Sequence, residues 1–125
     1  MKSTLRIALI GGLFLVTTNA MADFATMGIG TFTCGKFAEE YRTGSPTEVE
    51  NVYFTWAQGF MSAANIGLKS GSYRDMSAMT VDAEKEFVRN YCGEHPLARY
   101  FQAVMELWLK LPMKKTAMKK AAPSH

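Results

Sequence analysis

Residues 45–68, SPTEVENVYFTWAQGFMSAANIGL, place their apolar side chains on one broad arc when successive residues are set 100° apart. Ser45 is a suitable N-cap, Pro46 fits the first helical position, and Glu48 completes the pattern of a capping box. More than half of the circumference is apolar, so other helices must cover it. The pattern therefore predicts one long central helix around which the domain is built.

Three aromatic residues lie on the apolar side of this helix: Tyr53, Trp56 and Phe60. Their helical spacing favours a role in the core, although the same rings could form a box for a ligand. Small residues also recur every four positions, at Gly59, Ala63 and Gly67. Such a row allows close approach of helices, and we expect a helix of the same domain to pack against it.

The flanking segments predict three further helices. Thr33 can cap the first, which Gly44 ends, and Thr80 can cap the third, which Gly93 ends. Residues 95–111 form the fourth, beginning at the His-Pro pair. The predicted fold is all-α, a compact array of four helices around the long central one.

The longest predicted loop covers residues 69–79, KSGSYRDMSAM. Long loops in compact domains often carry binding residues, which makes Tyr73, Arg74 and Asp75 a candidate binding loop. In the alternative interpretation, Tyr73 and Met76 pack under the fold while Arg74 and Asp75 are only solvated.

Both ends of the chain differ in composition from its middle. Residues 1–22 combine a basic start, a short apolar run and small residues at the end, which is typical of a cleaved secretory signal peptide. An uncleaved anchor is the alternative. We expect a periplasmic protein with a single helical domain at 23–112, no stable membrane insertion, and a disordered basic tail at 113–125.

The net charge of +3 misrepresents the domain. Residues 23–112 contain eight basic and eleven acidic residues, a net charge of about −3. Because no basic face remains, a nucleic-acid partner is not expected.

Cys34 and Cys92 are the two cysteines of the sequence. An even number in an exported chain predicts a disulfide, and a reactive or metal-binding thiol pair is the alternative. Cys92 and His95 could form a small Cys/His enzyme site, which a disulfide would abolish. The sequence offers no other catalytic set, metal site or cofactor motif. The carboxylate pairs Glu39/Glu40 and Glu84/Glu86 are expected on solvated helix faces.

Three short motifs carry a resemblance: Thr33-Cys34-x-x-Phe37, Trp56-Ala57-Gln58-Gly59-Phe60 and Cys92-x-x-His95-Pro96-Leu97. Together they resemble the HdeA-type periplasmic acid-stress chaperones and the type VI secretion immunity proteins of the Rap and Tai group. The first resemblance implies a protein that holds denatured clients in acid after its dimer loosens. The second implies an inhibitor that occludes a cell-wall amidase.

The sequence thus predicts a non-catalytic protein whose partner is another protein, and which could form a homodimer. The alternatives are the Cys/His enzyme and a carrier of a hydrophobic small molecule in a cavity between the central and fourth helices.

Overall fold

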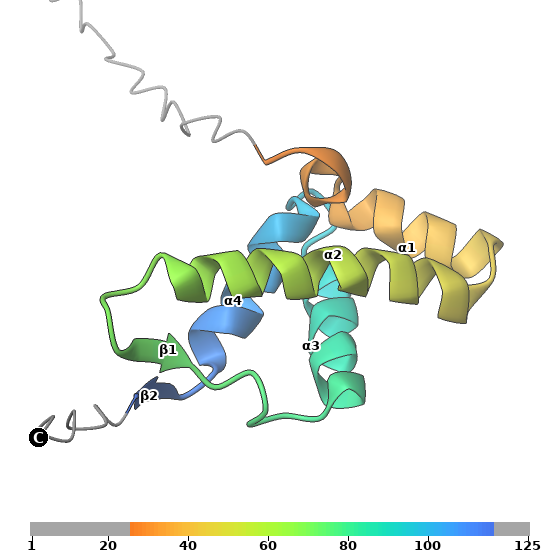
Figure 1. Cartoon of the computed structure of the whole chain (residues 1–125). Helices are drawn as coiled ribbons and strands as arrows, with labels where there is room; N and C mark the ends of the chain where they lie inside the picture. The colour runs from red at the N-terminus through yellow and green to blue at the C-terminus, as the bar shows by residue number, and fades with distance from the viewer. Residues whose placement is uncertain (1–25, 117–125) are drawn as a thin grey trace, which may run out of the picture.

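The computed structural model describes residues 26–116 of the chain. The fold of this part is all-α with one short two-stranded sheet (Figure 1). In chain order the elements are η1 (Gly28–Thr31), α1 (Cys34–Thr43), α2 (Pro46–Ile66), β1 (Ser72–Arg74), α3 (Val81–Glu94), α4 (Tyr100–Lys110) and β2 (Met113–Lys115). The predicted signal peptide and residues 117–125 of the predicted tail lie outside the described residues.

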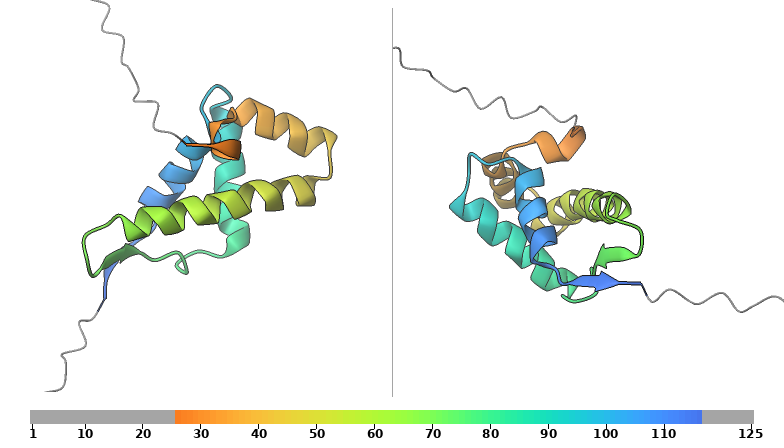
Figure 2. Two further views of the ribbon diagram at one scale, coloured as in Figure 1. Left: turned by 45° about the horizontal axis from the view of Figure 1, so that its top comes forward. Right: turned by 90° about the vertical axis from the view of Figure 1, so that its left-hand side faces the viewer.

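The long helix α2 is the centre of the array, as predicted (Figures 1 and 2). It packs against α1, α4, η1 and β1, while α3 packs against α1 and α4. The core between them contains mostly aromatic and aliphatic side chains: Phe37, Tyr53, Phe54, Met61, Val88, Tyr100, Val104, Leu107 and Leu111. The predicted disulfide between Cys34 and Cys92 is present and joins the start of α1 to the last turn of α3 inside this core.

Two of the predicted helix caps are confirmed. The Thr33 hydroxyl accepts a hydrogen bond from the Lys36 amide, and the Thr80 hydroxyl accepts one from the Ala83 amide. Ser45 differs, because its side chain makes no capping hydrogen bond although it occupies the N-cap of α2. The predicted capping box at the start of α2 is therefore not formed.

Helix α4 begins at Tyr100, five residues later than the predicted start, and α3 runs past Gly93 to Glu94. The segment between them contains a turn, closed by a hydrogen bond from the Ala98 amide to the His95 carbonyl, and it pairs with the start of α1. Its hydrogen bonds run from the Cys34 amide to the Ala98 carbonyl, from Gly35 to Pro96 and from Tyr100 to Phe32. The carbonyls of residues 96 and 98 thus satisfy free amides at the N-terminus of α1, and these hydrogen bonds hold the segment outside α4.

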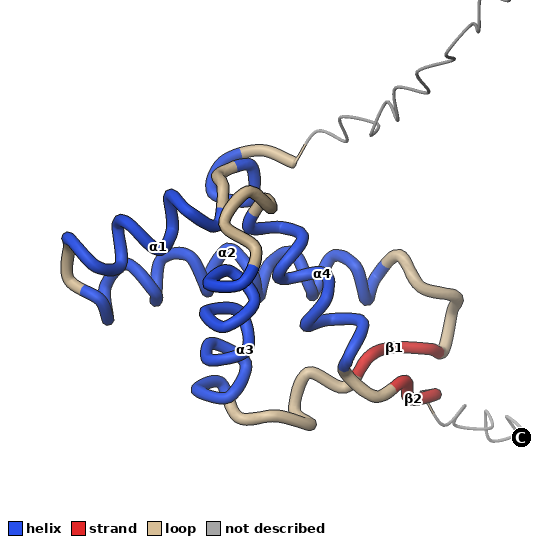
Figure 3. The backbone as a smooth tube through the Cα atoms, turned by 180° about the vertical axis from the view of Figure 1, so that it is seen from behind, coloured by secondary structure: helices blue, strands red, loops and turns tan. Residues whose placement is uncertain are grey.

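The prediction of a disordered tail from residue 113 is wrong at its beginning. Met113–Lys115 forms β2, which pairs antiparallel with β1 inside the predicted loop (Figure 3). The amide of Thr116 extends this pairing by donating to the Gly71 carbonyl at 2.6 Å. Each strand has only three residues, which is too short for a clear sequence pattern. The two strands are about forty residues apart, and only the tertiary fold brings them together.

Among residues 26–116, no helix combines the length and hydropathy needed to cross a bilayer.

Candidate functional site

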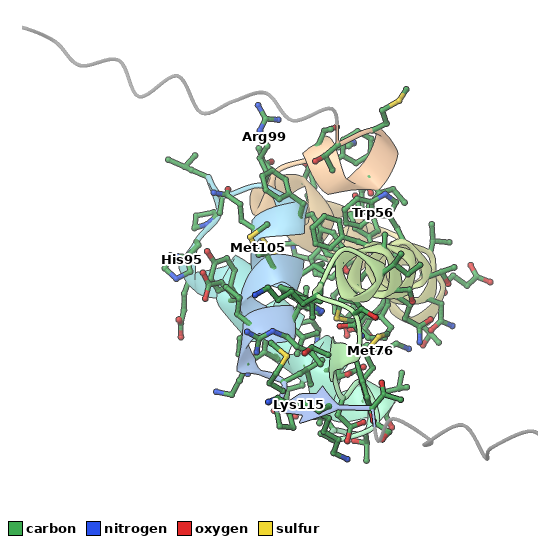
Figure 4. All side chains as sticks on the ribbon, turned by 60° about the vertical axis from the view of Figure 1, so that its left-hand side comes forward. Trp56, Met76, His95, Arg99, Met105 and Lys115 are labelled. Atoms are coloured by element: carbon green, nitrogen blue, oxygen red, sulfur yellow. A yellow bond between two sulfur atoms is a disulfide. The ribbon has the colours of Figure 1, made fainter. Side chains whose placement is uncertain are left out.

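An apolar groove opens on the surface between η1 and α2. Its volume is about 400 Å³, and it is open to solvent along one side. Trp56 is one of its lining residues, and Figure 4 shows this side chain between η1 and the upper side of α2. The groove is lined by Thr26, Met27, Thr55, Trp56, Gly59 and Phe60. None of these side chains is charged or titrates near neutral pH, so the groove offers contact surface rather than acid–base chemistry.

Trp56 is held in place by contacts on several sides. Its ring stacks on Phe60 with 5.4 Å between centroids and meets the edge of Tyr100 at 6.1 Å. Its outer ring atoms lie directly against the backbone of Gly30, where no side chain would fit. Trp56 and Phe60 are only half-buried at the edge of the core, so they form a fixed aromatic surface inside the groove.

Tyr53, the third predicted aromatic, lies in the core. It packs against Phe37 and Tyr100 with centroid distances of 4.8 and 4.9 Å. Its hydroxyl donates to a carboxylate oxygen of Glu40 at 2.5 Å. Burial, together with this carboxylate, raises the pKa of the Tyr53 hydroxyl, so the tyrosine stays neutral. Its role is to connect α1 and α2.

The expectation that another helix of the domain packs on the small-residue row of α2 is wrong. Gly59, Ala63 and Gly67 are exposed, and among residues 26–116 no atom outside the backbone of α2 itself lies within 4 Å of a Cβ built at Gly59. The apolar arc of α2 is wider than its neighbours can cover. As a result, Val52 remains 58% exposed and Ile66 85% exposed.

Arg74, from the predicted binding loop, is engaged within the fold. Its guanidinium donates to the carbonyls of Leu109 and Leu111 at 2.7 and 2.8 Å and lies 4.8 Å above the Trp108 ring. The Asn65 side chain holds its backbone through two 2.9 Å hydrogen bonds. Arg74 therefore ties β1 to the ends of α2 and α4, because the last carbonyls of a helix need donors.

Asp75 is also buried and not solvated. Its carboxylate forms an ion pair with Lys114 of β2 and accepts hydrogen bonds from the Ser77 hydroxyl and amide. These partners lower the pKa of Asp75 to about 2. Tyr73 is the most exposed residue of the three, so the structure divides the predicted binding loop into one surface residue and two structural ones.

Glu84 contradicts the expected solvated face, because it is only 3% exposed. One of its carboxyl oxygens has no hydrogen-bond partner among the described residues, and desolvation raises its pKa. The sequence holds a signal for this burial: Glu84, Val88 and Cys92 recur every four residues and so share the inner face of α3.

The thiol sites considered from the sequence are not available in this structure. Cys34 and Cys92 are bonded to each other, and the His95 ring packs on Tyr91 with 4.4 Å between centroids. Among the described residues, no three His, Cys, Asp or Glu side chains are arranged to hold a metal ion. The described pockets also differ from the expected carrier cavity, because one lies between η1 and α2 and the other is an open hollow beside Phe87 and Leu109.

Comparisons with protein-family models, with curated protein sequences and with solved structures found no match to this chain.

Proposed function

We propose that this chain is a non-catalytic periplasmic protein that binds another protein through the groove between η1 and α2. The observation that carries the proposal is the half-exposed Trp56–Phe60 stack, with the 80% exposed Met27 at its rim. Aromatic and methionine side chains are enriched at protein interfaces, and fixed aromatic surfaces bind at a low entropic cost. The buried disulfide supports an oxidising compartment.

The groove favours a partner that inserts an uncharged apolar side chain. Its lining is uncharged, and about 400 Å³ has room for one or two large side chains. The groove is already formed in the chain alone, and the Trp56 ring is fixed against Gly30. A groove of fixed shape suits one specific partner, as an inhibitor of the immunity type has, better than a range of denatured clients.

The test compares two exposed apolar residues that can be changed without opening the core. Met27 lies at the groove, whereas the 91% exposed Leu97 lies in the connection before α4. The protein is used to capture partners from periplasmic extract at pH 7. We expect one stoichiometric partner that is lost with Met27→Glu and kept with Leu97→Glu. Equal capture by both variants would rule out the groove as the binding site.

A second candidate is the acid-stress chaperone, which the ion pair between Asp75 and Lys114 supports. Protonation of Asp75 in strong acid would remove this contact between the loop and β2. The same capture at about pH 2, near the pKa of Asp75, distinguishes the two functions. Many clients bound only in acid would support the chaperone, and one partner bound at neutral pH would support the inhibitor.

A further inference from the structure

The outer face of α2 is exposed and carries no charge over most of its length. No charged residue occurs between Glu50 and Lys69. Five exposed residues, Gly59 among them, lie within about 40° of Gly59 around the helix axis, when successive residues are set 100° apart. These residues, here named the α2 strip, are Val52, Thr55, Gly59, Ala63 and Ile66. In Figure 4, where α2 is seen nearly along its axis, η1 lies above the helix and α4 lies beside it. Solvated helix faces normally carry charges, so an uncharged strip is typical of an interface.

Gly59 adds an independent observation. A glycine in the middle of a helix is less favourable than alanine. No described atom lies near its Cβ position, so no contact within the described chain requires a glycine there. A bare backbone at the centre of the strip allows a second helix to approach closely.

We propose that the α2 strip is the interface of a homodimer in which two copies of α2 cross antiparallel about a two-fold axis at Gly59. In this register, each residue meets the one equally far on the other side of Gly59. Val52 then faces Ile66 of the second copy, and Thr55 faces Ala63 of the second copy. The strip is therefore complementary to itself, as an isologous interface requires. The seven-residue spacing of Val52, Gly59 and Ile66 matches the shallow crossing of antiparallel helix pairs.

The charges at the two ends of α2 favour the antiparallel orientation. Exposed Glu48 lies in the first turn, on the side of α2 that carries Gly59, and exposed Lys69 follows the end of the helix. Antiparallel crossing brings Lys69 near Glu48 of the second copy. Parallel crossing would instead place the two Glu48 carboxylates together, which costs free energy.

The dimer interface borders the groove between η1 and α2, because Thr55 and Gly59 belong to both surfaces. The two-fold axis of an antiparallel helix pair lies in the interface and perpendicular to both helices. A rotation about this axis leaves the position of an element along the axis unchanged. The η1 segments of both copies therefore lie on the same side of the helix pair. The two Met27 side chains, which are 80% exposed, then meet on this side. A partner bound in the groove would therefore compete with the second copy of the chain, so the dimer is tested with the purified protein alone.

The first experiment is sedimentation equilibrium of the purified protein with its disulfide intact. A single helix pair is smaller than a standard interface of roughly 800 Å² per partner, so we expect a dissociation constant of about 1–100 μM. Gly59→Arg should give a monomer with unchanged circular dichroism. Gly93→Arg is the matched control, because Gly93 is also an exposed helical glycine with no atom near its Cβ position, and it should dimerise normally. A monomer throughout this range, or a dimer that persists in Gly59→Arg, would overturn the proposal.

Cross-linking tests the orientation. Val52→Cys and Ile66→Cys are purified separately with the native disulfide retained, then mixed and bridged with a short thiol cross-linker. Antiparallel crossing predicts that the mixture gives the 52–66 linked dimer, whereas neither variant links to itself. Self-linked Val52→Cys would indicate parallel helices and would contradict the proposed register.

Discussion

Trp56 lies against the backbone of Gly30, and this contact fixes η1 over α2. A Cβ at position 30 would overlap the indole ring and would lie 2.8 Å from the Thr26 methyl group. The position of η1, and with it the upper wall of the groove, therefore depends on the absence of one side chain.

Gly30→Ala should displace η1 and deform the groove. We expect the free energy of unfolding to fall by about 1–3 kcal/mol, as it does when a packed site is overfilled, with a shift in tryptophan fluorescence. Gly59→Ala is the control, because its Cβ meets nothing and alanine favours the helix by up to about 1 kcal/mol. Urea unfolding at low protein concentration measures both. A Gly30→Ala variant as stable as the wild type would show that η1 does not depend on this contact.

Replacing Arg74 should loosen the end of α4. In Arg74→Lys, a single ammonium group cannot reproduce both carbonyl hydrogen bonds and the contact with Trp108. We expect a loss of about 1–3 kcal/mol in the free energy of unfolding and faster hydrogen exchange in β2. Arg42→Lys, at an exposed position in the last turn of α1, should have almost no effect. Equal behaviour of the two variants would contradict a structural role for Arg74.

Asp75 predicts a loss of stability in strong acid. Its pKa is lowered to about 2 in the folded protein from 3.8, first by Lys114 and then by Ser77. A carboxyl group with a lowered pKa contributes stability above its unfolded pKa, and this contribution is lost as the pH falls from about 4 toward 2. In this range we expect the protection factors of the β2 amides, which are corrected for the intrinsic exchange rate at each pH, to fall. Asp75→Asn should show low protection factors already at pH 7, with no further step in acid. An acid step that is unchanged in Asp75→Asn would assign it to another carboxylate.

Glu84 predicts the opposite dependence on pH. Because burial raises its pKa above 4.5, the folded protein binds the proton more tightly than the unfolded chain. The contribution of the protonated Glu84 carboxyl group to the free energy of unfolding is fully present below the unfolded pKa. It is lost as the pH rises through the folded pKa. Glu84→Gln should therefore be more stable than the wild type at pH 7, and the difference should vanish below about pH 4.

Exposed Glu86, two residues further along α3, provides the control for Glu84. Glu86→Gln should leave the pH profile of the unfolding free energy nearly unchanged. If Glu84→Gln is less stable than the wild type at pH 7, the Glu84 carboxylate has a favourable partner in the folded protein. The conclusion that burial raises its pKa would then be wrong.

The disulfide should contribute a large part of the stability of so small a domain. It closes a loop with a sequence separation of 58, for which the chain-entropy model gives roughly 4 kcal/mol. The double variant Cys34→Ala and Cys92→Ala is expected to lose about 2–4 kcal/mol in urea unfolding at pH 7. Stability equal to that of the oxidised wild type would show that the bridge is dispensable for folding.

Helix periodicity, caps and cysteine number were sufficient to predict the helices and the disulfide. The reason is that these features depend on neighbours within a few residues, or on the oxidation of the only two cysteines. The burial of Glu84 could also have been found locally, from its four-residue spacing with Val88 and Cys92. Local pattern therefore determined the fold class and most of the core.

The tertiary structure decided which part of each apolar surface is covered. The pattern of α2 shows a wide apolar arc, but only the placement of α1 and α4 covers Tyr53 while it leaves Gly59 and Ile66 exposed. The pairing of β1 with β2, and the use of Arg74 and Asp75 to hold it, depend on residues about forty positions apart. A sequence pattern records how apolar a surface is, whereas the packing of distant segments decides what remains free to bind a partner.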